Sequence, residues 1–291
     1  MSQTFDQINY KFKTSFVKVY EYDVAYIDEG SSSDVLLFIH GLGSYLKAWD
    51  RNITVLKNSF RCIAVDLPGY GKSSKQIHNG TVEFYREFLN EFIKILDLHN
   101  ITLVGHSMGG QIALSYVINF PDIIKKLILA APAGFETFKP NEIEQLKSII
   151  SPEISYNTSD EQIRINYKTN FYQMPIEAEE MIADRITIKN DEEFFNHCQI
   201  VANSLTGLLA EQVFNQLNKI NIPTLIFFGK NDLLIPNRIH YKTSTEEIAK
   251  LGASQIRNSR LLLLENCGHF LQYEIPEIFN STVIDFIASN K

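Results

Sequence analysis

Residues 101–117 read ITLVGHSMGGQIALSYV, and this stretch decides which fold the chain can adopt. The apolar run 101–104 is typical of a buried strand, and residues 110–117 are typical of a helix. Between them stands Gly-x-Ser-x-Gly at 105–109, the pattern of a nucleophile elbow. Gly105 and Gly109 let the two backbones pass close together, and the sharp turn exposes the Ser107 hydroxyl. A serine hydroxyl is a weak nucleophile, so Ser107 needs a base.

Short apolar runs like 101–104 recur along the chain, and helical patterns separate most of them. Runs that are apolar on both faces are typical of parallel strands buried in a sheet. Their alternation with helices predicts an α/β fold with a mostly parallel, doubly wound sheet of about eight strands, in which residues 16–26 form one or two antiparallel strands. The apolar runs are 35–39, 62–65, 101–104, 127–130, 224–228 and 261–264, and the clearest helical patterns are 81–96, 241–251 and 277–288.

One segment interrupts this alternation. Residues 134–220 contain helical patterns and scattered aromatic side chains but no buried-strand run, and they far exceed the ~2–6 residues of an ordinary connection. We therefore predict an α/β core formed by residues 1–133 and 221–291, with 134–220 inserted as a helical cap. The aromatic residues of the cap, together with Met174 and Met181, are expected to line a substrate pocket or to pack the cap itself.

Two polar residues follow later strands at the places where a base and an orienting acid are needed. Reactive groups of an open parallel sheet gather beyond the carboxyl ends of its strands. Asp232 comes shortly after the run 224–228, and His269 comes after 261–264. We predict that His269 is the base for Ser107 and that Asp232 holds the imidazole.

Other residues compete for these roles less well. Residues 130–134, at the end of another strand, contain no carboxylate, whereas Glu265 ends a strand and is kept as an alternative acid. His106 adjoins Ser107, but neighbours on a sharp turn point apart, so we expect it to pack or hydrogen-bond nearby. The spacing of 37 residues between Asp232 and His269 is long, and we interpret residues 253–260 as a small loop insertion.

The oxyanion formed during attack on a carbonyl needs backbone donors. One candidate is the N–H of Met108, which follows the nucleophile. The other is the N–H of Leu42, since Gly41 and Gly43 on either side let that backbone face a substrate. Such chemistry requires no organic cofactor, and no Cys-x-x-Cys pair suggests a metal.

Length, composition and net charge limit the classes of protein to which the chain can belong. The chain has 291 residues, enough for one large α/β domain with an insertion or for two small domains, and 45% of them are hydrophobic. The net charge is −7 without a basic cluster, so we expect no nucleic-acid partner. The sequence leaves the oligomeric state open.

Compartment is predicted from cysteine usage and from hydropathy. Three widely spaced cysteines, Cys62, Cys198 and Cys267, fit a reducing compartment better than a disulfide framework. The N-terminus lacks the features of a signal peptide, and no apolar run approaches the ~20 residues of a membrane span. We therefore expect a cytoplasmic protein without a transmembrane segment, and peripheral membrane contact stays open.

Together these residues resemble the α/β-hydrolase fold superfamily, in which the triad follows the order Ser…Asp…His. The resemblance extends from about residue 17 to residue 287. Residues 132–134 and 263–269 resemble the monoacylglycerol-lipase-like and esterase branch. Carbon–carbon hydrolases are similar too, but they often have Asn before the serine and Trp after the histidine, where this chain has His106 and Phe270. The motifs that carry the resemblance lie at 40–43, 66–73, 105–110, 229–232 and 268–269.

The resemblance implies a serine hydrolase that cleaves small-molecule carboxylic esters of small or medium acyl chains through an acyl-enzyme. Two alternatives stay open. The same triad could cleave a carbon–carbon bond or open a lactone, or the chain could be a binding or signalling protein with slow turnover.

Overall fold

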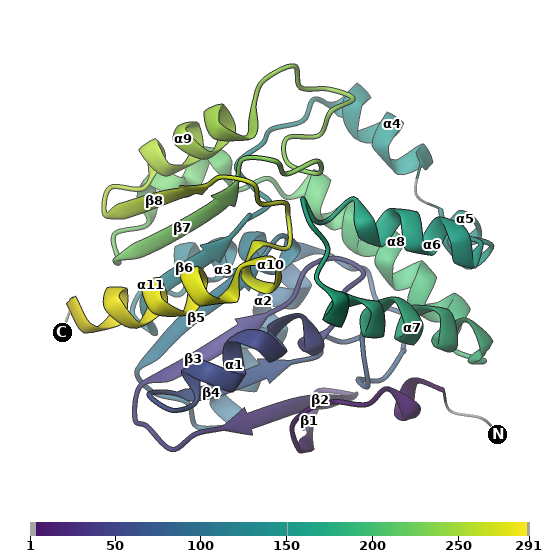
Figure 1. The fold of residues 1–291 in the computed structure, drawn as a ribbon, viewed down its shortest axis with the longest axis horizontal. Coiled ribbons are helices and arrows are strands. Elements are labelled where there is room, and N and C mark those ends of the chain that lie inside the picture. The colour runs from purple at the N-terminus through teal and green to yellow at the C-terminus, as the bar shows by residue number, and fades with distance from the viewer. Residues whose placement is uncertain (1–3, 150, 290–291) are drawn as a thin grey trace.

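The computed structural model describes residues 4–149 and 151–289 of the chain. Its centre is a single sheet in the order β1-β2-β4-β3-β5-β6-β7-β8 (Figure 1). The eight strands of the described chain are β1 (Thr14–Val19), β2 (Tyr22–Glu29), β3 (Val35–Ile39), β4 (Arg61–Val65), β5 (Ile101–His106), β6 (Ile124–Ala130), β7 (Thr224–Gly229) and β8 (Ser259–Leu264).

The sheet is antiparallel only at its beginning. Strand β2 pairs antiparallel with β1 and β4, and every other neighbouring pair is parallel. The side chains of β3 and β5 are buried at every position, as expected for central strands covered on both faces. The prediction of a mostly parallel, doubly wound α/β sheet is confirmed.

Helices cover both faces of the sheet. In Figure 1, α1 and α11 lie in front of the sheet and α2 and α3 lie behind it. The helix α2 begins after Thr81, whose hydroxyl accepts a hydrogen bond from the N–H of Phe84, and it buries one apolar side. The covering helices are η2 (Leu46–Trp49), α1 (Asp50–Leu56), α2 (Val82–Ile95), α3 (Met108–Asn119), α9 (Thr245–Gln255), α10 (Leu271–Glu274) and α11 (Pro276–Ser289).

Helix α9 differs from the expectation at both ends. It begins at Thr245 because Ser244 and Glu247 form a reciprocal capping box, which satisfies two backbone N–H groups at that point. It continues to Gln255, and β8 begins at Ser259. The predicted loop insertion at 253–260 is therefore wrong, because most of these residues complete the helix or start the strand.

Between β6 and β7, the described residues 134–149 and 151–220 form helices and loops without a strand. These helices occupy the right side of Figure 1. That they act as a separate cap stays a prediction. They are α4 (Pro140–Ile149), α5 (Pro152–Tyr156), α6 (Asp160–Lys168), η3 (Ile176–Ala178), α7 (Glu179–Thr187), η4 (Ile188–Asn190), α8 (Phe194–Ala210) and η5 (Phe214–Lys219).

The N-terminal turn η1 (Phe5–Gln7) is tied to this inserted segment. The N–H and hydroxyl of Thr4 and the N–H of Phe5 all donate hydrogen bonds to Asp191 Oδ2, at 2.6, 2.9 and 3.2 Å. Burial raises the pKa of the Asp191 carboxyl, but a hydrogen bond from the N–H of Glu193 and the bonds from Thr4 and Phe5 outweigh it and hold the pKa below its usual range. The Asp191 carboxylate thus ties the N-terminal segment to the inserted segment.

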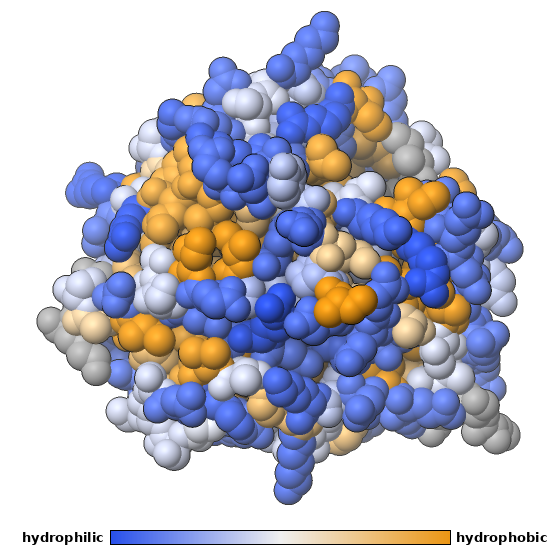
Figure 2. Space-filling view, viewed as in Figure 1, coloured by the Kyte–Doolittle hydropathy of each residue, from blue (hydrophilic) through white to orange (hydrophobic). Residues whose placement is uncertain are grey.

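The face of the molecule in Figure 2 is largely hydrophilic, with several hydrophobic patches between the polar side chains. Among the described residues, no helix has the length and apolar character needed to cross a membrane.

Candidate active site

Ser107 lies at the turn between β5 and α3 in a backbone conformation that few side chains adopt. Its φ is 51° and its ψ is −117°. The turn is held from both sides, because the N–H of Ser107 donates to the carbonyl of Ala130 and its own carbonyl accepts from Ala133. The side chain is half-buried and borders a cavity. This is the arrangement expected for a nucleophile elbow.

The glycines of the pentapeptide have the packing role predicted for them. A Cβ at Gly105 would lie 2.4 Å from the carbonyl oxygen of Gly109, and a Cβ at Gly109 would lie 2.3 Å from the carbonyl oxygen of Ile39. Both distances are far below van der Waals contact. The start of α3 can therefore rest on β3 and β5 only when these positions carry no side chain.

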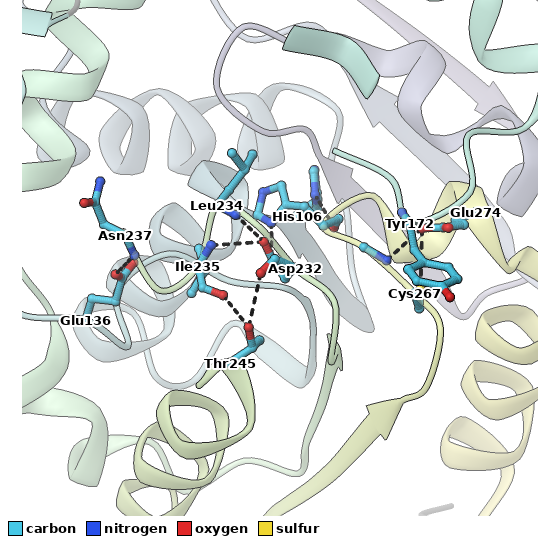
Figure 3. Close-up of polar contacts among 12 residues, drawn as sticks. His106, Glu136, Tyr172, Asp232, Leu234, Ile235, Asn237, Thr245, Cys267 and Glu274 are labelled. Atoms are coloured by element: carbon cyan, nitrogen blue, oxygen red, sulfur yellow. Dashed lines mark hydrogen bonds and ion pairs between the residues drawn. The ribbon is translucent and has the colours of Figure 1, made fainter. Parts of the chain in front are cut away.

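His269 and Asp232 meet beyond the ends of β8 and β7. His269 Nδ1 lies 2.7 Å from Asp232 Oδ2, and both side chains are buried. The second carboxylate oxygen of Asp232 accepts from the N–H groups of Leu234 and Ile235, at 2.7 and 3.0 Å (Figure 3). The carboxylate is therefore fixed by its own loop and can hold the imidazole in one orientation.

The two competing residues point to other partners. Glu265 is mostly exposed and pairs with Lys230 at 2.7 Å, so the structure gives no support to its use as the acid. His106 Nε2 lies 3.2 Å from the backbone carbonyl of His269, which makes His106 the hydrogen-bonding neighbour that we expected. Burial lowers the pKa of His106 well below its usual value, so it stays neutral.

The two expected oxyanion donors lie beside Ser107. Met108 is the first residue of α3, where a backbone N–H has no acceptor within the helix. The loop that carries Leu42 passes the serine closely, since a Cβ built on Gly41 would be 3.1 Å from the Cβ of Ser107. Leu42 itself borders the same cavity. His40, which precedes this loop, accepts from the N–H of Leu67 and so braces it.

Ser107 and His269 open into one cavity of about 350 Å³. Its wall is mostly aliphatic and comes from both the sheet side and the inserted segment. The large apolar side chains of the inserted segment and of the loop after β7 that border it are Phe138, Leu146, Leu205, Leu208, Leu209, Leu234, Ile235 and Ile239.

Of the two expectations for the apolar residues of the insertion, packing describes both methionines and pocket lining describes Phe138. Met181 lies in the hydrophobic core and Met174 packs against it, and neither borders the cavity in the described part of the chain. The leucines of α8 take that place. A helical pattern alone does not reveal them, because the side of α8 that faces Ser107 depends on how the insertion docks.

Sequence reasoning also missed Glu136. It stands just beyond residues 130–134, where no carboxylate was found, and it borders the cavity while only 8% of its surface is exposed. Its Oε1 accepts from the N–H of Asn237 at 2.6 Å (Figure 3). Burial raises the pKa of Glu136 to about 7, and the nearby Asp232 acts in the same direction.

Possible metal ligands do not cluster in this region. Within residues 4–149 and 151–289, no group of three or more His, Cys, Asp or Glu side chains is placed to hold a metal ion. The three cysteines are buried and free.

Comparison with known proteins identifies the family. A family model described as the alpha/beta hydrolase fold matches residues 34–181, a span that contains the Ser107 elbow. The chain belongs to the alpha/beta hydrolase family. Its loop 40–43 and its elbow both fall within the matched span, whereas the loops carrying Asp232 and His269 follow it.

Curated relatives of this alpha/beta hydrolase are named as hydrolases of 2-hydroxy-6-oxononadienedioate and 2-hydroxy-6-oxononatrienedioate. It is 28% identical to the 2-hydroxy-6-oxononadienedioate/2-hydroxy-6-oxononatrienedioate hydrolase 1 of Pseudomonas putida, over 97% of this chain and 99% of that protein. The enzyme of the same name, without the number, from Paraburkholderia phymatum is 26% identical over 92% of each chain.

Solved structures of esterases and other hydrolases share the fold. An esterase from Exiguobacterium antarcticum has a TM-score of 0.79 and 25% identity, covering 95% of this chain and all of that one. A protein from Pseudomonas aeruginosa described as a probable hydrolytic enzyme has a TM-score of 0.85 and 21% identity, covering 96% of this chain and 95% of the other. The second likeness supports the fold alone.

Proposed function

We propose that this alpha/beta hydrolase cleaves carboxylic esters of small or medium acyl chains with Ser107, His269 and Asp232 as its triad. The observation that carries the proposal is that Ser107 and the His269–Asp232 pair converge on one largely apolar cavity. A cavity of about 350 Å³ accommodates a small or medium acyl chain beside the serine.

In the proposed reaction, His269 Nε2 takes the proton of the Ser107 hydroxyl while its Nδ1–H donates to Asp232. The serine oxygen attacks the ester carbonyl, and the N–H groups of Leu42 and Met108 stabilise the oxyanion. The carbon–oxygen bond to the alcohol breaks, and the alcohol leaves with the proton from His269. Water, deprotonated by His269, then attacks the acyl-enzyme and releases the acid.

A second candidate uses the same residues on a different bond. The curated relatives are named as hydrolases of 2-hydroxy-6-oxo dienedioates, which favours carbon–carbon cleavage. In that case the serine site would act on a ketone carbonyl next to the bond that breaks, and simple esters would be poor substrates.

The test compares the kcat/KM of the protein on p-nitrophenyl butyrate with that on a 2-hydroxy-6-oxo dienoate. We expect the ester to be the better substrate. Ser107→Ala should lower ester turnover by up to about 10⁶-fold, as removal of a triad nucleophile does. The matched control is Ser254→Ala, because Ser254 is an exposed serine on α9.

Equal ester turnover in Ser107→Ala and in the unchanged protein would show that Ser107 is not the nucleophile. A strong preference for the dienoate, lost in Ser107→Ala, would replace the ester proposal with the carbon–carbon alternative.

A further inference from the structure

Acidic and basic side chains are unequally represented in the wall of the cavity. Among the described residues that border it, Glu136 is the one carboxylic acid, and neither lysine nor arginine contributes. The other polar side chains of the wall are neutral amides, the nucleophile and two histidines. They are Gln111, Asn170, Gln212, Asn237, Ser107, His106 and His269.

Glu136 is held in place at this wall. The residue lies in the loop after β6, and its Oε1 accepts from the N–H of Asn237 at 2.6 Å, so the carboxyl is tied to the loop after β7. Figure 3 shows this pair on the same side of the site as the Asp232 loop. With 8% of its surface exposed, Glu136 has little water to screen its charge.

The neighbouring charges do not convert this wall into an anion site. The negative charge of Asp232 raises the pKa of Glu136 further, whereas His269 and Arg238 lower that pKa. The Arg238 guanidinium is already engaged, because it donates to the backbone carbonyls of Asp232 and Thr243 at 2.7 and 3.1 Å. A carboxylate on a substrate would therefore meet a buried acid without a free cation to pair with.

We propose that Glu136 makes the cavity selective for uncharged substrates and excludes substrates that carry a carboxylate at the end of the acyl chain. The inference rests on the proposed function, and it separates this chain from the curated relatives, whose printed substrates are dioates. A charge buried beside another of the same sign in a poorly solvated cavity is strongly disfavoured.

The experiment uses two esters of similar length, p-nitrophenyl pentanoate and mono-p-nitrophenyl glutarate, which differ in a terminal carboxylate. We expect the kcat/KM for the uncharged ester to exceed that for the charged one by roughly tenfold or more at pH 8. Glu136→Gln should reduce this ratio at least about threefold, chiefly by improving the charged substrate. Similar ratios for the two proteins, or a ratio near one in the unchanged protein, would overturn the proposal.

The matched control is Glu161→Gln, which removes the same charge from an exposed position on α6. It should leave the ratio unchanged. A fall in the ratio equal to that of Glu136→Gln would mean that net charge, and not the cavity wall, sets the selectivity, and would also overturn the proposal.

Selectivity should also depend on pH. Burial raises the pKa of Glu136 to about 7, and Asp232, His269 and Arg238 are the charged or titratable groups around it. The ratio should therefore rise between pH 6 and pH 8 more steeply in the unchanged protein than in Glu136→Gln. Glu136→Gln keeps the other three groups, so the difference between the two profiles isolates Glu136. A ratio with the same pH dependence in both proteins would contradict the role of Glu136.

Binding separates this inference from the proposed function. If neither ester is hydrolysed, the proposed function fails, but a methyl ketone and its ω-carboxylate analogue can still be compared by thermal shift. We expect the uncharged ketone to stabilise the protein and the carboxylate to do so only in Glu136→Gln. Equal stabilisation of the unchanged protein by both ketones would overturn the inference on its own.

Discussion

At the scale of single residues, the strained backbone of Ser107 is the feature on which the site depends. A φ of 51° at a non-glycine residue costs on the order of 1–3 kcal/mol. Hydrogen bonds from Ser107 N to Ala130 O and from Ala133 N to Ser107 O hold the turn in this conformation. This conformation places Ser107 at the cavity that His269 also borders, where the proposed chemistry needs it.

The acid of the triad provides a direct test at this scale. Asp232→Asn should lower kcat for ester hydrolysis by about 10⁴-fold, because an amide no longer holds the catalytic tautomer of the base. The size of the variant side chain is unchanged, so the fold should persist, as circular dichroism can verify.

Glu265→Gln is the control for Asp232→Asn. Glu265 follows β8 and pairs with Lys230 at the surface, so its loss should change kcat by less than about twofold. If Glu265→Gln lost activity and Asp232→Asn kept it, the assignment of the acid would be reversed.

The candidate triad could be predicted from sequence, whereas Glu136 could not. Ser107, Asp232 and His269 each follow an apolar run, and parallel strands bring their carboxyl ends to one edge. Glu136 lies farther into a loop, and the direction of its side chain depends on its bond to Asn237, about 100 residues away. No local pattern contains that information.

At the scale of elements, the junction of β5 and α3 is where the fold tolerates least change. The Cα of Gly105 faces the backbone of Gly109, and that of Gly109 faces β3, so three elements meet without side chains between them. The turn at Ser107, the strand β5 and the helix α3 are thereby held in one arrangement relative to each other.

Gly105→Ala should destabilise the protein by more than about 3 kcal/mol, because the added methyl group would overlap the Gly109 carbonyl. Gly43→Ala is the control, since a Cβ there meets nothing within 4 Å and only its φ of +66° opposes the change. We expect a loss of about 1 kcal/mol for the control. Urea unfolding measures both, and equal losses would show that the junction is less tightly packed than described.

Elements with strong local signals were predicted well. The bounds of the strands agree with those of the predicted apolar runs to within a few residues, and the bounds of α2 agree with its amphipathic pattern. Helix α9 was misplaced although its start has a local signal, because the prediction did not use the Ser-x-x-Glu capping-box pattern at Ser244–Glu247. The docking of α8 over the cavity could not be predicted, since non-local packing decides it.

At the scale of the whole molecule, buried histidines and buried carboxyls change the stability with pH in opposite directions. Burial lowers the pKa of His40 and His78 to about 4, which costs stability as pH falls below about 6.5. Burial raises the pKa of Asp50 and Glu136 to about 7, so the folded state holds protons that the unfolded state has released. Stability from these carboxyls is lost as pH rises through 7.

Between pH 6.5 and pH 8 the histidines of the unfolded chain still release protons, which raises the free energy of unfolding, whereas the two carboxyls lower it. The contribution of Asp50 is therefore isolated by comparing a variant with the unchanged protein. The Asp50 carboxyl is buried, and its Oδ1 has no hydrogen-bond partner among the described residues. Over this interval the free energy of unfolding of Asp50→Asn should rise by about 0.8 kcal/mol relative to that of the unchanged protein. Urea unfolding at the two pH values checks this, with Glu161→Gln as the surface control.

An Asp50→Asn profile parallel to that of the unchanged protein would contradict this account of the buried carboxyls.

The central claim, that Ser107 is the nucleophile of a serine hydrolase, is tested most directly by covalent labelling. The protein is treated with a fluorophosphonate, and intact mass, peptide mapping and p-nitrophenyl butyrate turnover are followed on the same sample. The account predicts one adduct per chain, located on Ser107, with turnover lost in proportion to labelling. An adduct on another residue, or full turnover with Ser107 fully modified, would contradict it.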